Sequence, residues 1–258
     1  MRTKRALSGT DIYHVMARGN GKQEIFLDEV DNRYFLKLLI GAKNAHEAKI
    51  YAYCLMGNHY HLLIECKTLP EFCKEVNQTY AHYFNAKNAT VGHVFQSRYK
   101  SFPVENGDYL LCVLRYIHRN PVKAGMVASP VEYFWSSYKD YLSGEGLTTT
   151  YPILKLFDSK LLEARKRFIS FSQKEDGFDF ESFQAQEHFE DYKKCEALVK
   201  NWQIKKEKPC DEELKAMNLA IANETVLSGK EIYGILGISQ TKYYTKIAKK
   251  KSKTSVPF

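Results

Sequence analysis

The sequence predicts an α+β fold in which helices cover one antiparallel sheet. Short runs rich in β-branched and aromatic residues alternate with longer segments whose apolar residues recur at helical spacing. The composition is that of an ordinary globular chain, with 44% hydrophobic and 26% charged residues. These values exclude disordered and fibrous proteins, so a packed sheet–helix core is expected.

The predicted elements follow the order β-α-β-β-α-β and then a further helix. The predicted strands cover residues Ile12–Arg18, Lys49–Met56, His59–Cys66 and Tyr99–Glu105, and the predicted helices cover Asp28–Ala45, Leu69–Lys87 and Asn106–Asn120. A tight-turn pair, Gly57-Asn58, joins the second and third strands as a hairpin. Pro103 places the fourth strand at an edge, and Pro121 is expected to stop the last helix. This order is the split βαβ, ferredoxin-like arrangement, with two helices on one face of the sheet.

A helical C-terminal region is expected after the first domain. Around residues 143–150 (SGEGLTTT) the composition becomes small and polar, so we expect one domain at 1–145 and a helical extension at 146–258. Residues 228–251 show helix, glycine turn and helix, which is typical of a helix-turn-helix. Its second helix could contact DNA through Lys242, Lys246 and Lys249. A plain helical hairpin that packs on the first domain is the alternative.

Charge favours a polyanionic partner. The net charge is +8 and the pI about 9.0, and Lys and Arg side chains that neutralise phosphates release condensed counterions. A basic protein without such a partner is the alternative.

The six cysteines form no C-x-x-C pair, so we expect reduced thiols rather than a zinc site. No apolar run approaches the length of a membrane span, and we expect a cytoplasmic protein without membrane contact.

A histidine pair on the third predicted strand is a candidate metal site. His59 and His61 are two residues apart, so both imidazoles project from the same face of a strand. Each can donate one nitrogen to a divalent cation. Two histidines on a half-exposed sheet face, without any metal, are the alternative. A metal would also need a further ligand from another segment.

A polar pair on the third predicted helix could complete the site. Tyr116 and Asn120 are four residues apart and share a helix face. The carbonyl of an asparagine suits Mg²⁺ or Mn²⁺, and a cation beside a phenol would favour attack of its oxygen on a phosphate. The alternative is a core tyrosine and an asparagine just past the helix end, because the residue before a proline is disfavoured in helical geometry. His14 and His118 are rival ligands.

Several segments resemble a known family. The stretches YHVMARGN, LMGNHYHLLIE, VFQSRYKS, YIHRNPVKAG and FWSSYKDYL follow one another over roughly the first 145 residues. They resemble the single-tyrosine HUH transposases of the IS200-like type, most of all the REP-associated tyrosine transposases. The resemblance implies that Tyr116 is the nucleophile and that His59, His61 and Asn120 hold Mg²⁺ or Mn²⁺. At Asn120 the chain departs from the IS200 enzymes, which usually have glutamine there.

The resemblance also implies a reaction and a substrate. Tyr116 would attack single-stranded DNA beside an imperfect hairpin, form a 5′-phosphotyrosine link and release a 3′-hydroxyl that can rejoin an end. A positive rim would hold the DNA backbone, with contributions from Arg18, Arg98, Lys100, Arg115, Arg119 and Lys123. We expect a monomer rather than a homodimer. The alternative functions are a non-catalytic protein that binds hairpin DNA or RNA, and a DNA-binding regulator.

Overall fold

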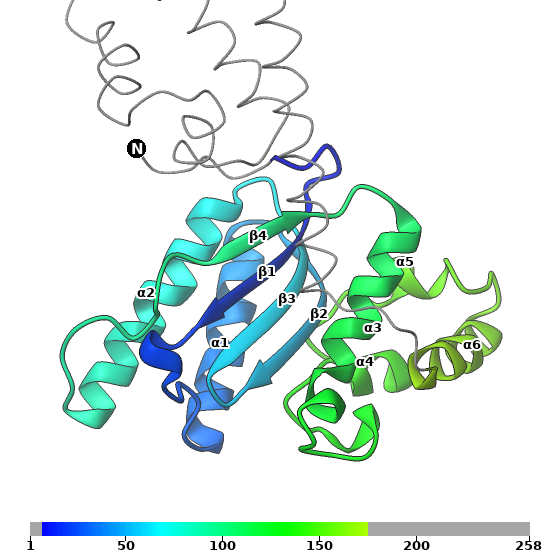
Figure 1. Ribbon diagram of the computed structural model, residues 1–258. Helices are drawn as coiled ribbons and strands as arrows, with labels where there is room; N and C mark the ends of the chain where they lie inside the picture. The colour runs from blue at the N-terminus through cyan, green and yellow to red at the C-terminus, as the bar shows by residue number, and fades with distance from the viewer. Residues whose placement is uncertain (1–6, 175–258) are drawn as a thin grey trace, which may run out of the picture. The chain divides into compact units, whose positions relative to one another are not determined.

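Four antiparallel strands form one sheet in the order β2-β3-β1-β4 (Figure 1). The strands are β1 (Ile12–Arg18), β2 (Lys49–Met56), β3 (His59–Glu65) and β4 (Lys100–Pro103). The computed structural model describes residues 7–174 of the chain. With β1 and β3 in the centre, the sheet has the predicted ferredoxin-like order, and β4 is the edge strand that Pro103 indicates.

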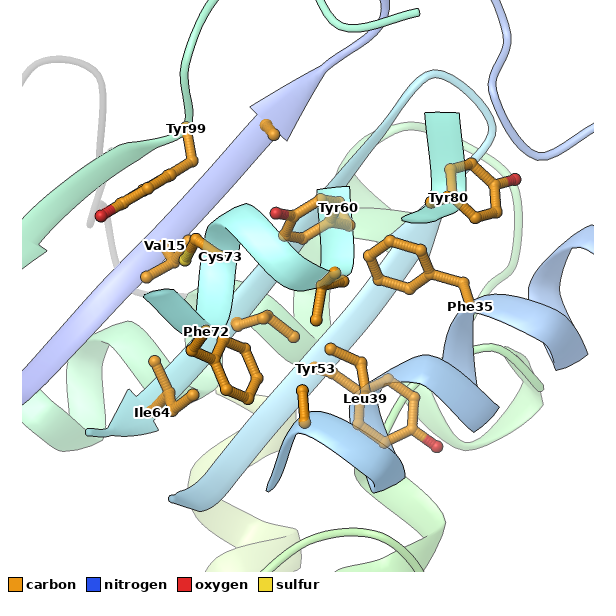
Figure 2. Packing of buried hydrophobic residues seen from close by; sticks show 14 of the residues in the cluster. Val15, Phe35, Leu39, Tyr53, Tyr60, Ile64, Phe72, Cys73, Tyr80 and Tyr99 are labelled. Carbon is orange, nitrogen blue, oxygen red and sulfur yellow. The ribbon is translucent and has the colours of Figure 1, made fainter. Parts of the chain in front are cut away.

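Two long helices cover one face of this sheet. They are α1 (Glu29–Ala45) and α2 (Leu69–Asn88). Alternate residues of a strand point to the same face, and on this face Val15, Tyr60 and Ile64 pack with Phe35 of α1 and Phe72 of α2 (Figure 2). All five side chains are buried. The predicted arrangement of two helices on one face is therefore confirmed.

Shorter helices and one further long helix follow along the chain. They are α3 (Gly107–Lys123), α4 (Tyr138–Ser143), α5 (Tyr151–Leu154) and α6 (Leu161–Gln173). Two short 3-10 helices complete the described elements: η1 (Asn20–Lys22) lies between β1 and α1, and η2 (Pro130–Glu132) lies between α3 and α4. The helix α3 packs on β2 and β3. Leu63 of β3, Leu114 of α3 and Phe168 of α6 belong to a second buried core. This core lies on the sheet face opposite to α1 and α2, because residues of one strand alternate between the two cores.

The segment after residue 145 shares the second core. Ile153 and Leu154 of α5, and Ala164 and Phe168 of α6, are buried together with residues of α3. All residues from 7 to 174 also belong to one compact unit. The predicted boundary at residue 145 therefore does not coincide with a break in packing. The small, polar composition around it marks a surface turn between helices of the same core.

The helix α3 continues past its proline and ends at Lys123. The expectation that Pro121 stops the helix at Asn120 is therefore wrong. A proline removes one backbone donor from a helix, but the N–H of Ala124 still donates to the carbonyl of Asn120, at 2.9 Å. As a result, Asn120 lies inside the same helix as Tyr116, one turn after it.

Three further expectations concern the cysteines, membrane-spanning helices and the C-terminal region. Within the described residues, Cys54, Cys66, Cys73 and Cys112 lie outside any disulfide bond. Among the helices of residues 7–174, none combines the length and the apolar character needed to span a bilayer. The predicted helix-turn-helix at 228–251, with Lys242, Lys246 and Lys249, lies outside the described residues.

Candidate active site

Strand pairing places the candidate histidines on the side of the sheet that carries α3. In the antiparallel pair of β1 and β3, Met16 lies opposite His61 and Arg18 lies opposite His59. Residues directly opposite each other point to the same face. Leu63, two residues after His61, belongs to the second core beside α3. His59 and His61 therefore share one face, as their spacing on a strand predicts, and the structure shows that this face carries α3.

The two histidines of β3 are neighbours and both are neutral at pH 7. Their ring centroids lie 5.0 Å apart. Burial, with a smaller contribution from the charge of Arg18, lowers the pKa of His59 to about 4. His61 is only 2% exposed, and burial, together with the neighbouring His14 and His59, lowers its pKa well below 6.5. Neutral imidazole is the form that coordinates a metal ion.

Hydrogen bonds at Nδ1 hold both rings. The Nδ1 of His59 donates to the Oδ1 of Asn58 at 2.6 Å, and the Nδ1 of His61 lies 2.9 Å from the Nε2 of His14. Histidines that bind metals commonly make such a bond with the nitrogen that does not coordinate. The donor set of two Nε2 atoms therefore fits a divalent cation. Among residues 7–174, no group of three His, Cys, Asp or Glu side chains could hold one. The third ligand expected from the sequence is the amide oxygen of Asn120.

Tyr116 faces these histidines from α3. The centroid of its ring lies 5.5 Å from that of His61 and 5.9 Å from that of His14, with its ring edge-on to both. The side chain is half-buried. One turn later, the amide nitrogen of Asn120 donates to the main-chain carbonyl of Tyr116 at 2.8 Å. The structure thus brings Tyr116 and the histidine pair into one cluster. Coordination by Asn120 stays a prediction.

Four of the basic residues proposed from the sequence lie where a polyanion could reach them. Arg98, Lys100 and Lys123 are exposed and Arg18 is half-buried. Lys100 lies opposite Met16 in the pairing of β1 with β4, so it points to the same side as the histidines. Arg18 lies opposite His59. Contact of these residues with DNA stays a prediction.

The other two basic residues, Arg115 and Arg119, contact the C-terminal end of α6. The guanidinium of Arg115 lies 4.1 Å from the ring centre of Phe171 and donates to the carbonyl of that residue. Arg119 donates to the carbonyls of Ser172 and Gln173, at 3.4 and 3.1 Å. Cations are favourable there, since the last carbonyls of a helix carry partial negative charge. Both residues therefore stabilise the packing of α6 on α3, and their predicted contact with DNA is untested.

The two rival histidines lie in different places. His118 is buried in the second core, where its Nε2 lies 2.8 Å from the Oγ of Ser137 and its ring packs edge-on against Tyr141. His14 lies inside the cluster, as the hydrogen-bond partner of His61. The sequence suggests that His14 could line the sheet beside the pair, but it does not identify the hydrogen bond to His61. The alternation along β1 indicates which face His14 occupies, but only the pairing of β1 with β3 brings it beside His61.

The chain is similar to known transposases. Residues 10–120 match the family model described as IS200-like transposase. The structure of a REP-associated tyrosine transposase bound to a REP hairpin matches with a TM-score of 0.50 and 15% identity, over 70% of this chain and 95% of that one. A crystal structure from Deinococcus radiodurans, described as a transposase, matches with a TM-score of 0.33 and 17% identity, over 46% of this chain and 97% of that one. No curated protein matches the chain significantly.

Proposed function

We propose that the chain cuts and rejoins single-stranded DNA with Tyr116 as the nucleophile. The proposal starts from the match of residues 10–120 to the IS200-like transposase family model. One observation carries this proposal. The half-buried Tyr116 lies with its ring centroid 5.5 Å from that of His61. His61 in turn lies beside His59, whose Nε2 can also coordinate. This combination of a phenol and a cation-binding pair is suited to transfer of a phosphate group.

The residues proposed to hold the cation are His59 and His61, through Nε2, and Asn120, through its amide oxygen. Both imidazoles are neutral, the form that can coordinate, and the amide oxygen of Asn120 is the kind of ligand that Mn²⁺ and Mg²⁺ prefer. When bound, the cation polarises the oxygens of the phosphate and draws off negative charge as the bond to the leaving group breaks. Tyr116, one helical turn before Asn120, would then face the same phosphate.

The proposed reaction exchanges one phosphate ester for another. The Oη of Tyr116 attacks phosphorus and forms the O–P bond of a 5′-phosphotyrosine, while the bond between phosphorus and the 3′ oxygen breaks. The phenol proton passes to solvent and the leaving oxygen takes up a proton, which yields a 3′-hydroxyl. Attack of a 3′-hydroxyl on the phosphotyrosine reverses these steps and joins two ends. The number of ester bonds does not change, so ATP is not required.

The proposed substrate is single-stranded DNA that contains an imperfect hairpin, bound by a monomer. The related structure with the same fold has a REP hairpin bound, and this chain has a net charge of +8. The proposed backbone contacts are Arg18, Arg98, Lys100 and Lys123, with Lys242, Lys246 and Lys249 as further candidates. Phosphate contacts of this kind give affinity that falls with salt.

Formation of a covalent adduct tests the proposal. Purified full-length protein is incubated with Mn²⁺ and labelled single-stranded hairpin DNA that carries a 5′ flank, and the products are separated on a denaturing protein gel. We expect a labelled protein band that Tyr116→Phe abolishes. Tyr109→Phe, two turns earlier on the same helix, is the matched control and should keep the band.

Two outcomes would count against the proposal. An adduct that survives in Tyr116→Phe shows that another residue is the nucleophile. Wild-type protein that binds the hairpins but forms no adduct on any of them supports the alternative of a non-catalytic hairpin-binding protein.

A further inference from the structure

His14 occupies the centre of the candidate active site although it does not belong to the expected ligand set. It is fully buried on β1, and its Nε2 lies 2.9 Å from the Nδ1 of His61. Its ring also contacts Tyr116 and Phe102, with centroid distances of 5.9 and 6.0 Å. His14 therefore touches both His61, a proposed ligand, and Tyr116, the proposed nucleophile.

A hydrogen bond between two neutral imidazoles has two possible arrangements. The two nitrogens lie 2.9 Å apart and share one hydrogen, so one ring donates and the other accepts. In the first arrangement His61 donates from Nδ1, and its Nε2 keeps a lone pair. In the second arrangement His14 donates, so His61 carries its hydrogen on Nε2 and cannot coordinate through that atom. Only the first arrangement is compatible with a metal ion at the Nε2 of His61.

We propose that His14 is a positioning residue, which accepts the hydrogen bond from Nδ1 of His61 and thereby presents the Nε2 lone pair of His61 to the cation. The inference rests on the proposed function for the identity of the cation. The hydrogen bond and the resulting tautomer of His61 do not depend on it. Partners of this type commonly change metal affinity by roughly 10- to 100-fold.

The chain contains a matched control for the loss of a buried histidine. His118 is as fully buried as His14, and burial lowers the pKa of each to about 3. Each also makes its hydrogen bond through Nε2. His118, however, bonds to Ser137 in the second core and not to a proposed ligand. Loss of either ring leaves a comparable cavity, but only loss of His14 should alter His61.

Three variants of the full chain test the inference: His14→Leu, His14→Gln and His118→Leu. Thermal melting first establishes that each is folded. Affinity for Mn²⁺ is then measured by electron paramagnetic resonance. We expect His14→Leu to bind Mn²⁺ about tenfold or more weakly than His118→Leu. His14→Gln should recover most of the affinity, because its amide oxygen can accept the same hydrogen bond.

A second readout uses neither metal nor DNA. Long-range ¹H–¹⁵N correlation spectra of the histidine rings report which nitrogen of His61 carries the hydrogen. We expect Nδ1–H in the wild type and in His14→Gln, and a shift toward Nε2–H in His14→Leu. A wild-type His61 with its hydrogen on Nε2, or equal Mn²⁺ affinities of His14→Leu and His118→Leu, overturns the inference. Wild-type protein that does not bind Mn²⁺ refutes the proposed metal site, while the tautomer of His61 still decides the role of His14.

Discussion

Buried histidines make the stability of this protein depend on pH. In an unfolded chain an imidazole titrates near 6.5, whereas in the folded protein the pKa of His14 and of His118 is about 3. Between these values the unfolded state binds more protons, so the free energy of unfolding falls as the pH decreases from 6.5 towards 3. Each histidine contributes a slope of up to about 1.4 kcal/mol per pH unit. Urea-induced unfolding at pH 7 and pH 5 measures this loss.

A variant of a single histidine shows which residue causes the change of the free energy of unfolding with pH. His118→Asn should be less stable at pH 7 but should lose less stability on acidification than the wild type, since its share of the proton uptake is gone. A slope that is unchanged in His118→Asn contradicts the assignment.

At the scale of elements, the helix that carries Tyr116 is held at its first turn by a side-chain cap. The side-chain oxygen of Asn106 accepts a hydrogen bond from the backbone N–H of Tyr109, at 2.8 Å. Asn106→Ala should lower the free energy of unfolding by about 1 kcal/mol, because a helix donor is left without this acceptor. Asn106→Asp keeps an acceptor and should stay close to the wild type. Equal losses in both variants, measured by chemical denaturation, would disprove the capping role.

The same helix, α3, also contacts α6. Basic residues that bond to α6 are expected to stabilise the fold, whereas exposed basic residues are expected to bind DNA. Arg119 donates to carbonyls of Ser172 and Gln173, so Arg119→Ala should cost about 1 kcal/mol of stability. The exposed Lys100 should act on DNA instead. Lys100→Ala should reduce the logarithmic salt slope of binding to single-stranded DNA by about 0.7 for each phosphate that the lysine no longer neutralises.

Salt titrations of hairpin binding, followed by fluorescence anisotropy, compare the two variants. Arg119→Ala should keep the wild-type slope. If its slope falls as far as that of Lys100→Ala, Arg119 contacts DNA as the sequence suggests, and the bond to α6 does not exclude that contact.

At the scale of the whole described unit, the sheet has a core on each face, and the second core depends on α6. Phe168 of α6 is fully buried there. Phe35 is buried in the same way in the first core (Figure 2). Phe168→Ala should therefore cost about 3–5 kcal/mol, the same range as Phe35→Ala. Leu162, on the same helix, is 67% exposed, and Leu162→Ala should cost little. A small effect of Phe168→Ala would mean that α6 is a separate extension, as the boundary at residue 145 suggests.

The sequence alone determined the identity and order of the elements up to α3. The strands β1 and β2 have the predicted ends, and α1 begins one residue later, after its cap Asp28. These features are local, because strand alternation, helical spacing and caps depend on neighbours in the chain. The spacing of His59 and His61 and the one-turn separation of Tyr116 and Asn120 are local in the same way. The end of α3 could not be predicted, because helical hydrogen bonds beyond Pro121 compensate for the missing donor.

Only the tertiary structure decided how these local features meet. The register of β1 against β3 puts His14 beside His61, and the packing of α3 puts Tyr116 beside both rings. The packing of α6 on α3 gives Arg119 a partner far along the chain. Register and helix packing depend on hydrogen bonds and buried surfaces shared by residues distant in sequence. A pattern of neighbouring residues does not contain that information. The candidate ligands His59 and His61 could therefore be identified from the sequence, whereas the hydrogen bond between His14 and His61 could not.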